Sequence, residues 1–171
     1  MTNLKYYRLD RKNITEEQFE QIVAVESEDG YTEDQLRRIW FEDEKDDNFV
    51  CVDGDKIIAH ISYNPQSKRR NGSLYMINLS VLPEYRRKGI AMGLINTATE
   101  YYMSQDQTLP MSLSVDKDNI PALRLYQKVG FEIKDPVCEV DEDDEPYIME
   151  SNLLNIRETI RKISRQLEEK Y

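Results

Sequence analysis

The sequence contains little of the chemistry that holds metals or disulfides. Its 171 residues include one histidine, His60, and two cysteines, Cys51 and Cys138. A structural zinc site takes about four Cys and His ligands, so we expect no metal. Each cysteine stands alone in a strand-like run, as buried thiols of a reducing compartment do. A disulfide between the two is the alternative interpretation, because sequence alone does not fix the pairing.

Long apolar segments are also missing. No stretch approaches the ~20 apolar residues that a membrane-spanning helix needs. Residues 1–10 are mixed and charged, without the apolar centre of a signal peptide. We therefore expect a cytoplasmic protein that has no membrane partner.

Positive charge is in short supply. Lysine and arginine number 23 against 33 aspartates and glutamates, which gives a formal net charge of −10. A chain this acidic is repelled by phosphate backbones, so we expect no nucleic-acid partner. The excess of carboxylates leaves two interpretations open: attraction of a cationic substrate such as an amine, or solubility alone.

What is present fits one globular domain with regular secondary structure. Hydrophobic residues make up 39% and charged residues 33% of the chain, which is the balance of a folded protein with one core. Capping boxes at Thr15 and Thr32 mark the starts of two helices, and Gly30 is expected to end the first in a left-handed cap. Further helices are predicted from Gly89 to Ser104 and over residues 119–129. Strands are predicted over residues 4–10, 48–52, 56–63, 73–82, 110–115, 131–140 and 146–153, with a polar loop over residues 64–72.

The order β-αα-βββ-α-β-α-ββ indicates a mixed α/β fold. Because helices interleave with strands and three strands precede the third helix, we expect a mixed sheet with helices on both faces. We divide the chain into a domain over residues 1–153 and an amphipathic C-terminal helix over residues 154–171.

The C-terminal helix carries an apolar stripe. Its members fall at spacings of 3, 4, 3 and 4, which is an a/d pattern over two heptads, shorter than a coiled coil needs. The helix either packs on its own domain or pairs with another subunit in a homodimer. The stripe consists of Leu153, Ile156, Ile160, Ile163 and Leu167.

Residues 79–91 carry the strongest functional signal: a strand, a short turn and the start of a helix. A helix N-terminus has unpaired N–H groups and a partial positive charge, and it binds phosphate where the backbone is accessible. Gly89 and Ala91 remove side-chain bulk there, while Arg86, Arg87 and Lys88 add positive charge to an acidic chain. The segment is thus a candidate diphosphate site, and a basic surface turn is the alternative.

Two blocks of this sequence resemble the GNAT superfamily of acetyltransferases. Arg86-x-x-Gly89-x-Ala91 is similar to the family signature that binds the pyrophosphate of coenzyme A through backbone N–H groups. The second block, Asn119-x-x-Ala122-x-x-Leu125-Tyr126-x-x-Val129-Gly130-Phe131, resembles the family's helix and its Gly-Phe exit. The resemblance covers about residues 4–153. It implies a twisted, mostly antiparallel sheet of about seven strands.

The resemblance implies an acetyl-CoA-dependent N-acetyltransferase acting by direct attack in a ternary complex. Tyr126 matches the family's general acid, although its spacing also suits a core aromatic. Asn119 matches a residue that contacts the cofactor arm, and it is also a suitable helix N-cap. The backbone N–H of Val81 is the expected oxyanion donor. The cofactor-binding residues implied are Leu79, Val81, Arg86, Arg87, Lys88, Gly89, Ile90, Ala91, Asn119 and Tyr126.

The general base is not identified by the resemblance. Tyr75 stands where some relatives carry a glutamate. His60, on a predicted strand, is interpreted as structural rather than as a base. The other candidates are the polar residues Asn78, Glu28, Asp29 and Tyr31.

The acceptor is the least determined part of this function. Residues 27–32 and 137–147 match the family's substrate loops, and both segments are acidic. We therefore expect a cationic amine acceptor, such as a polyamine, an aminoglycoside-like amine or a lysine-containing peptide. The alternative function is a non-catalytic module that binds acetyl-CoA for regulation or interaction.

Overall fold

The computed structural model describes residues 3–27, 30–41, 46–68, 72–134 and 145–170. The predicted order of elements is confirmed. Within these residues, the 3-10 helices η1 (Arg11–Asn13) and η4 (Pro83–Tyr85) accompany the strands and α-helices. The strands are β1 (Leu4–Leu9), β2 (Asp47–Asp53), β3 (Lys56–Ser67), β4 (Ser73–Val81), β5 (Met111–Val115), β6 (Glu132–Lys134) and β7 (Tyr147–Ser151). The α-helices are α1 (Glu16–Glu26), α2 (Glu33–Phe41), α3 (Ile90–Ser104), α4 (Ile120–Lys128) and α5 (Leu153–Glu169).

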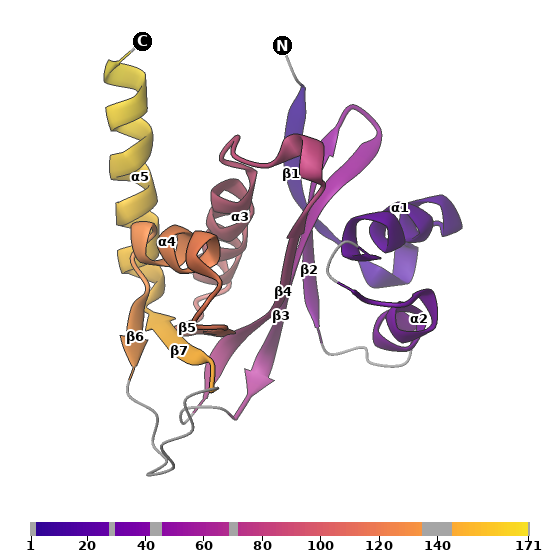
Figure 1. Cartoon of the computed structure of the whole chain (residues 1–171), viewed down its shortest axis with the longest axis horizontal. Helices are drawn as coiled ribbons and strands as arrows, with labels where there is room; N and C mark the ends of the chain where they lie inside the picture. The colour runs from indigo at the N-terminus through magenta and orange to yellow at the C-terminus, as the bar shows by residue number, and fades with distance from the viewer. Residues whose placement is uncertain (1–2, 28–29, 42–45, 69–71, 135–144, 171) are drawn as a thin grey trace.

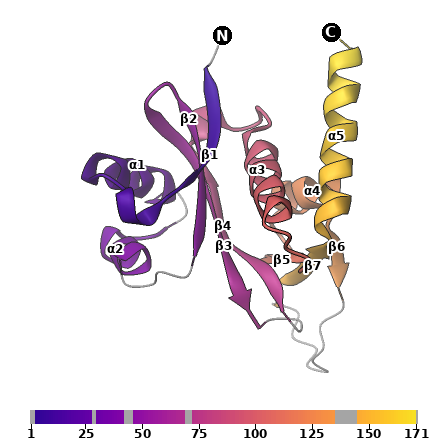
Figure 2. The same cartoon turned by 180° about the vertical axis from the view of Figure 1, so that it is seen from behind.

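The strands form one seven-stranded sheet in the order β1-β2-β3-β4-β5-β7-β6. Every neighbouring pair is antiparallel except β4 and β5, which are parallel. Helices α1 and α2 cover one face, and α3 lies on the other with α4 and α5 beside it (Figures 1 and 2). The expected mixed sheet with helices on both faces is therefore confirmed.

An aromatic cluster fills the layer between the sheet and α3. Phe49 of β2 lies edge-on to Tyr63 of β3 at a centroid distance of 6.2 Å, and to Tyr101 and Tyr102 of α3 at 5.5 and 6.1 Å. Edge-to-face packing brings the positive rim of one ring against the negative face of the next. The cluster thereby anchors α3, whose N-terminus lies at the predicted phosphate site.

Close packing of β1 on α3 requires a glycine. The Tyr6 ring lies so near Gly93 that a Cβ there would be 2.6 Å from its carbons. Side chains do not tolerate that separation, so β1 and α3 approach each other only at a residue without a side chain.

The sequence predicted the N-terminal caps of α1 and α2 correctly, but not the C-terminal end of α1. Both capping boxes are formed: Thr15 and Gln18 exchange hydrogen bonds of 3.1 and 3.0 Å, and Thr32 and Gln35 bonds of 3.2 and 2.9 Å. The prediction that Gly30 ends α1 in a left-handed cap is wrong, because α1 stops at Glu26 and has Ser27 as its C-cap. Gly30 has a φ of +88° but lies beyond that helix.

Strand β3 is longer than predicted. It continues to Ser67 and pairs with β4 at Asn64↔Tyr75 and Ser67↔Ser73, so part of the polar loop predicted over residues 64–72 is strand. The pairing is irregular between Asn64 and Ser67, where Pro65 has no N–H to donate. Strand β6 is described only to Lys134, and residues 135–144 of the predicted strand and acidic turn lie outside the described part.

The C-terminal helix α5 begins on its own domain. Leu153, Ile156 and Ile160 are buried in the common core, and the Arg161 guanidinium lies 3.4 Å from the Glu100 carboxylate of α3. Ile163 is half-buried and Leu167 is exposed. The first half of the stripe therefore packs within the chain, and pairing of the second half with another copy stays a prediction.

Candidate active site

The site begins where two parallel strands stop pairing. Strands β4 and β5 pair at Leu74↔Met111 and Tyr75↔Ser112, and no further positions along them are paired in the described residues. Side chains also bridge this end: the Ser73 and Ser112 hydroxyls are 2.6 Å apart, and the Tyr75 hydroxyl donates to Ser114 at 3.1 Å. Beyond it the strands diverge, which opens a cleft in the middle of the sheet.

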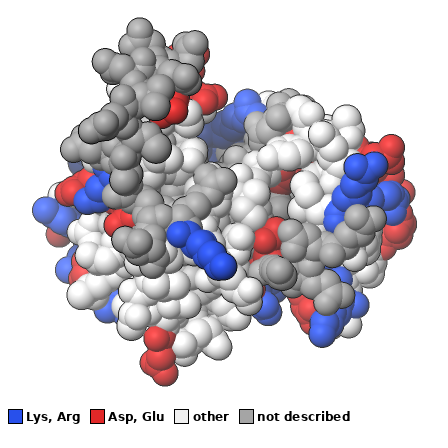
Figure 3. All heavy atoms as spheres, turned by 90° about the horizontal axis from the view of Figure 1, so that it is seen from below, with Lys and Arg blue, Asp and Glu red and all other residues white. Residues whose placement is uncertain are grey.

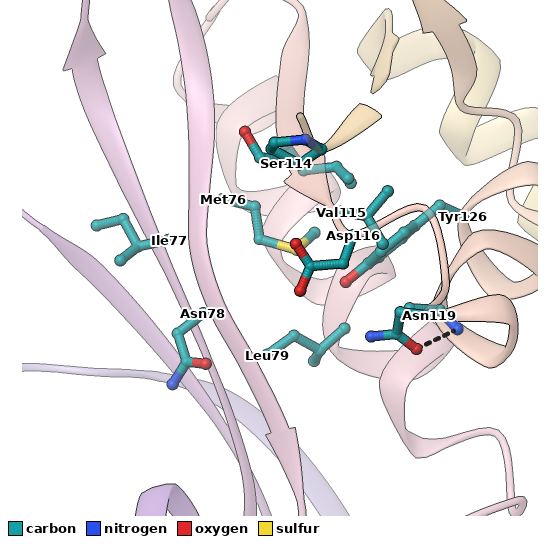
Figure 4. Close-up of a pocket in the computed structure, with 12 residues that line it drawn as sticks. Met76, Ile77, Asn78, Leu79, Ser114, Val115, Asp116, Asn119 and Tyr126 are labelled. Atoms are coloured by element: carbon teal, nitrogen blue, oxygen red, sulfur yellow. Dashed lines mark hydrogen bonds between the residues drawn. The ribbon is translucent and has the colours of Figure 1, made fainter. Parts of the chain in front are cut away.

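A bulge in β4 determines which residues face this cleft. Ser62 of β3 pairs with Asn78, and the next residue, Tyr63, pairs with Met76, so Ile77 is an extra residue on β4. A bulge shifts the alternation of side chains by one position. Figure 4 shows the result: Met76 and Leu79 point toward Tyr126, while Ile77 and Asn78 both point to the other side of the strand.

A pocket occupies the cleft between the diverging strands. It brings together three residues that the sequence predicted for the site, Leu79, Asn119 and Tyr126, with the base candidate Asn78. Sequence reasoning did not assign the remaining members to the site, although Ala122 belongs to the second family block; several of them lie at the end of β5 or just after it. These are Met76, Ile77, Leu113, Ser114, Val115, Asp116, Ala122 and Pro146.

Tyr126 reaches this pocket from helix α4. Its side chain is largely buried, at 8% exposure, and its ring packs edge-on to Phe131 at a centroid distance of 5.9 Å. The phenol oxygen points into the pocket (Figure 4). Tyr126 is thus both part of the core, as its helical spacing suggested, and a polar group at the cleft.

Asn119 is the N-cap of the same helix. Its Oδ1 accepts a hydrogen bond of 3.3 Å from the backbone N–H of Ala122, which confirms the capping interpretation. An N-cap satisfies one of the unpaired donors of the first turn. Asn119 therefore fixes the start of α4 and stands in the pocket wall.

The predicted phosphate loop lies at the other end of β4, before α3. Gly89 is the N-cap of α3, with a φ of +77°, and Arg87 is also left-handed, with a φ of +63°. Arg86, Arg87, Lys88 and Gly89 are exposed, whereas Ile90 faces the core. The loop thus presents cations and free backbone N–H groups to solvent.

The loop is held to the strand that leads to the pocket. The Arg86 Nε donates to the Val81 carbonyl oxygen at 3.0 Å, and the Lys88 ammonium lies 5.5 Å from the centroid of the Tyr85 ring. Val81 and the loop residues do not line the pocket. The two parts of the predicted site are therefore separate, and β4 connects them through Leu79.

The base candidates fall in different places. Asn78 lines the pocket, Tyr31 is half-buried, and the Tyr75 hydroxyl is used by Ser114. His60 is buried and hydrogen-bonded to Glu26 and Asn48. Glu28 and Asp29 lie outside the described residues, as does Cys138.

Titratable groups are few in the pocket lining, and both signs of charge occur on the described surface. Asp116 and Tyr126 carry the titratable side chains of the pocket lining. Figure 3 shows acidic and basic side chains interspersed over the described part of the face seen from below. Burial raises the pKa of the nearby Tyr63 phenol well above its usual range, and Tyr126 adds to this shift.

Two further features of the described residues bear on the sequence predictions. Cys51 is a buried free thiol. The described part of the chain contains no group of three or more His, Cys, Asp or Glu side chains that could hold a metal, and no helix there is both long and apolar enough to span a bilayer.

The sequence matches the model of the Acetyltransferase (GNAT) family over residues 11–131, more than half of its length. An L-amino acid N-acetyltransferase from Escherichia coli is 29% identical over 85 residues, which are 50% of this chain and 52% of that protein. The chain thus covers about half the length of this relative.

Solved structures share the fold. A GNAT-family protein from Desulfovibrio desulfuricans superposes with a TM-score of 0.71 at 12% identity, over 88% of this chain and 99% of the other. An aminoglycoside 6'-N-acetyltransferase complexed with coenzyme A gives a TM-score of 0.69 at 15% identity, over 87% and 97% of the two chains. At these identities the likeness concerns the fold alone.

Proposed function

Because the chain belongs to the acetyltransferase (GNAT) family, we propose that it transfers the acetyl group of acetyl-CoA to a primary amine. The observation that supports this most is the position of Tyr126. Its phenol points into a pocket between diverging strands, and one of these strands, β4, leads to a basic helix N-terminus. One cofactor would occupy both places.

Acetyl-CoA would lie along β4. Its diphosphate would be bound by the backbone N–H groups and cations of residues 86–91, since a helix N-terminus favours anions. Its pantetheine arm would follow Leu79 toward the pocket, where Asn119 lines the opposite wall. The aminoglycoside acetyltransferase that shares this fold binds coenzyme A, which supports the assignment.

In the proposed reaction the amine attacks the thioester directly, in a ternary complex. The tetrahedral intermediate needs a donor to its oxyanion, and the leaving thiolate needs a proton. Tyr126 would be the general acid for that thiolate. Backbone N–H groups of β4 would stabilise the oxyanion; Val81 was the expected donor, but residues 76–79 are the part of β4 that lines the pocket.

We propose a cationic acceptor, such as a polyamine, an aminoglycoside-like amine or a peptide amine. The support is the net charge of −10 and the carboxylate of Asp116 in the pocket lining. The Asp116 carboxylate would attract the ammonium form of the acceptor before the ammonium group loses its proton. Acetylation of only neutral or anionic amines in a broad panel would contradict this part of the proposal.

The first experiment follows the release of free CoA thiol from acetyl-CoA with a panel of amines. We expect acceptor-dependent release by the wild type, and a fall of about 10²-fold or more in kcat for Tyr126→Phe, as for loss of a general acid. Tyr101→Phe is the matched control, because Tyr101 lies in the core cluster on α3, outside the pocket lining.

The outcomes separate the alternatives. Wild-type kinetics in Tyr126→Phe would remove the general-acid role while leaving the enzyme. Tight acetyl-CoA binding by calorimetry, without thiol release for any amine, would indicate the non-catalytic binding module. Absence of both binding and release would contradict the assignment of residues 86–91 to the cofactor.

A further inference from the structure

Five polar side chains form a connected chain on the face of the sheet that α1 covers. Glu26 ends α1, His60 lies on β3, Ser80 and Asn78 lie on β4, and Asn48 lies on β2. Glu26, His60, Asn48 and Ser80 are buried, with exposures of 1%, 2%, 2% and 3%. Of the five, Asn78 alone also lines the pocket, although its side chain points to the side of β4 opposite Tyr126.

The hydrogen bonds of Asn48 and His60 determine where protons lie at one end. The Asn48 amide nitrogen donates to the carbonyl oxygen of Asp46 at 3.2 Å, so its Oδ1 faces His60 Nε2 at 2.9 Å as an acceptor. Nε2 therefore carries a hydrogen. Nδ1 of His60 is hydrogen-bonded to Glu26 Oε1, so the pair holds one further proton between them and has no net charge.

The other carboxylate oxygen of Glu26 lies next to Ser80. Ser80 Oγ lies 3.4 Å from Glu26 Oε2 and 3.4 Å from Asn78 Oδ1. A hydroxyl has one hydrogen to donate and rotates, so Ser80 is within reach of both of these acceptors and donates to one of them at a time. This hydroxyl connects the buried pair to the residue in the pocket wall.

Stability alone is a poor explanation for this arrangement. Burial of two ionisable groups costs several kcal/mol of solvation, and well-packed apolar side chains are often as stable in such positions. The surrounding residues offer an apolar environment, since the Trp40 ring lies 5.3 Å from the His60 ring. A buried proton-binding pair next to a site that must remove a proton therefore suggests a function.

Two other charged groups approach this pair from neighbouring elements. The Arg11 guanidinium of η1 lies 5.2 Å from the centroid of the Trp40 ring, and it pairs with the Asp46 carboxylate at 3.8 Å. Their opposite charges offset each other. Arg11 and Asp46 therefore add little net charge beside the pair, and Glu28 and Asp29 lie outside the described residues.

We propose that the Glu26–His60 pair accepts the proton that the amine substrate loses, through Ser80. The proposal rests on the acetyltransferase function proposed above and supplies its missing base. An ammonium N–H bond breaks and its proton passes to a water at Asn78. That water gives a proton to Ser80 Oγ, and Ser80 gives its own to Glu26 Oε2.

The proton count balances at each step. The amine becomes neutral and nucleophilic, and the water and Ser80 regain the hydrogens they gave. The Glu26 carboxylate becomes a carboxylic acid, so the pair carries the positive charge that the ammonium lost until the proton leaves for solvent. His60 keeps its two N–H groups. One proton leaves the protein for solvent in each turnover, which is the net proton that acetylation of an ammonium releases. No group is oxidised or reduced.

The decisive variant is Ser80→Ala, which breaks the path and leaves the Glu26–His60 pair in place. Ser62→Ala is its matched control, since Ser62 is a buried serine on the neighbouring strand, register partner of Asn78 and outside this chain of hydrogen bonds. We expect kcat to fall about tenfold or more in Ser80→Ala, as for loss of base assistance. The control should keep wild-type kcat, and both variants should stay folded with wild-type acetyl-CoA affinity. Ser80→Ala should lower Tm somewhat, because it leaves the buried Glu26 Oε2 without a donor.

The pH dependence of kcat/KM provides a readout that a structural role would not change. With two acceptors of different amine pKa, the acidic limb of the wild-type profile should stay in place, because the protein's own base controls it. In Glu26→Gln the acidic limb of the kcat/KM profile should shift with the pKa of the acceptor amine. The reason is that, without the base, only acceptor molecules that are already neutral react. Should Glu26→Gln not fold, the two serine variants decide the question.

Three results would overturn the proposal. Equal kcat for Ser80→Ala and Ser62→Ala would do so, and so would a wild-type acidic limb that follows the acceptor's pKa. Both results leave the acetyltransferase function intact. Absence of thiol release from the wild type with every amine would remove both proposals together.

Discussion

At the scale of single residues, backbone conformation determines which substitutions the proposed phosphate loop, residues 86–91, tolerates. Gly89 and Gly30 both have left-handed φ values, +77° and +88°, and at both positions an added Cβ would meet no atom within 4 Å. A side chain at either site costs about 1–2 kcal/mol of backbone strain without a steric clash. The two positions differ in location, because only Gly89 begins α3.

We therefore expect Gly89→Ala and Gly30→Ala to destabilise the fold by similar amounts, about 1–2 kcal/mol in urea unfolding. Only Gly89→Ala should weaken acetyl-CoA binding in calorimetry, because strain there shifts the N–H groups at the start of α3. Equal acetyl-CoA affinities for the two variants would show that this turn does not contact the cofactor.

At the scale of an element, helix α4 combines structural and functional demands. Its N-cap Asn119 and its pocket residue Tyr126 lie on the same short helix, and the cap holds the first turn through Ala122. Any change that loosens the cap therefore also moves Tyr126. The capping role and the expected contact of the Asn119 amide with the cofactor arm need variants that separate them.

Asn119→Asp and Asn119→Ala provide that separation. Aspartate caps helices about as well as asparagine, whereas alanine loses about 1 kcal/mol. We expect Asn119→Ala to lower Tm and acetyl transfer, and Asn119→Asp to keep wild-type Tm. If the amide contacts the cofactor, Asn119→Asp still raises the KM for acetyl-CoA; a wild-type KM would assign Asn119 to capping alone.

At the scale of the whole molecule, buried tyrosines make stability depend on alkaline pH. Burial raises the pKa of Tyr6, Tyr63 and Tyr102 above the ordinary phenol value. Tyr63 has no hydrogen-bond partner for its hydroxyl among the described residues. Because the folded-state pKa is raised, the stability from these phenols is complete below about pH 10 and is lost as pH rises above that value.

We expect the free energy of unfolding to fall above about pH 10, with the buried phenols of Tyr63 and Tyr102 each adding about 1.4 kcal/mol per pH unit to the slope. Tyr6 is half-buried, so solvent screening makes its contribution smaller. Tyr63→Phe should reduce the slope of the unfolding free energy against pH by about 1.4 kcal/mol per pH unit, the contribution of one phenol. Since it also removes an unsatisfied buried hydroxyl, it should not lower stability at pH 7. Urea unfolding from pH 7 to 11 measures both, and an unchanged slope would mean that Tyr63 ionises in the folded state.

The sequence by itself determined the order of elements and the mixed sheet, and it identified residues 86–91 as a candidate phosphate loop. These depend on local signals: hydrophobic period, capping boxes and the combination of Gly89 with neighbouring cations, all of which act within a few residues. The predictions of helix ends and strand lengths were less accurate. The pairing of β3 with β4, which lengthens β3 to Ser67, involves residues distant in sequence.

Only the tertiary structure decided how the site is assembled. The bulge at Ile77 and the divergence of β4 from β5 come from strand pairing across the sheet, and they select the side chains that face Tyr126. The same is true of Asp116 in the pocket and of the contact between Glu26 and His60, which are 34 positions apart. No local sequence pattern predicts either feature, because each forms only when α1, β3, β4 and β5 pack together.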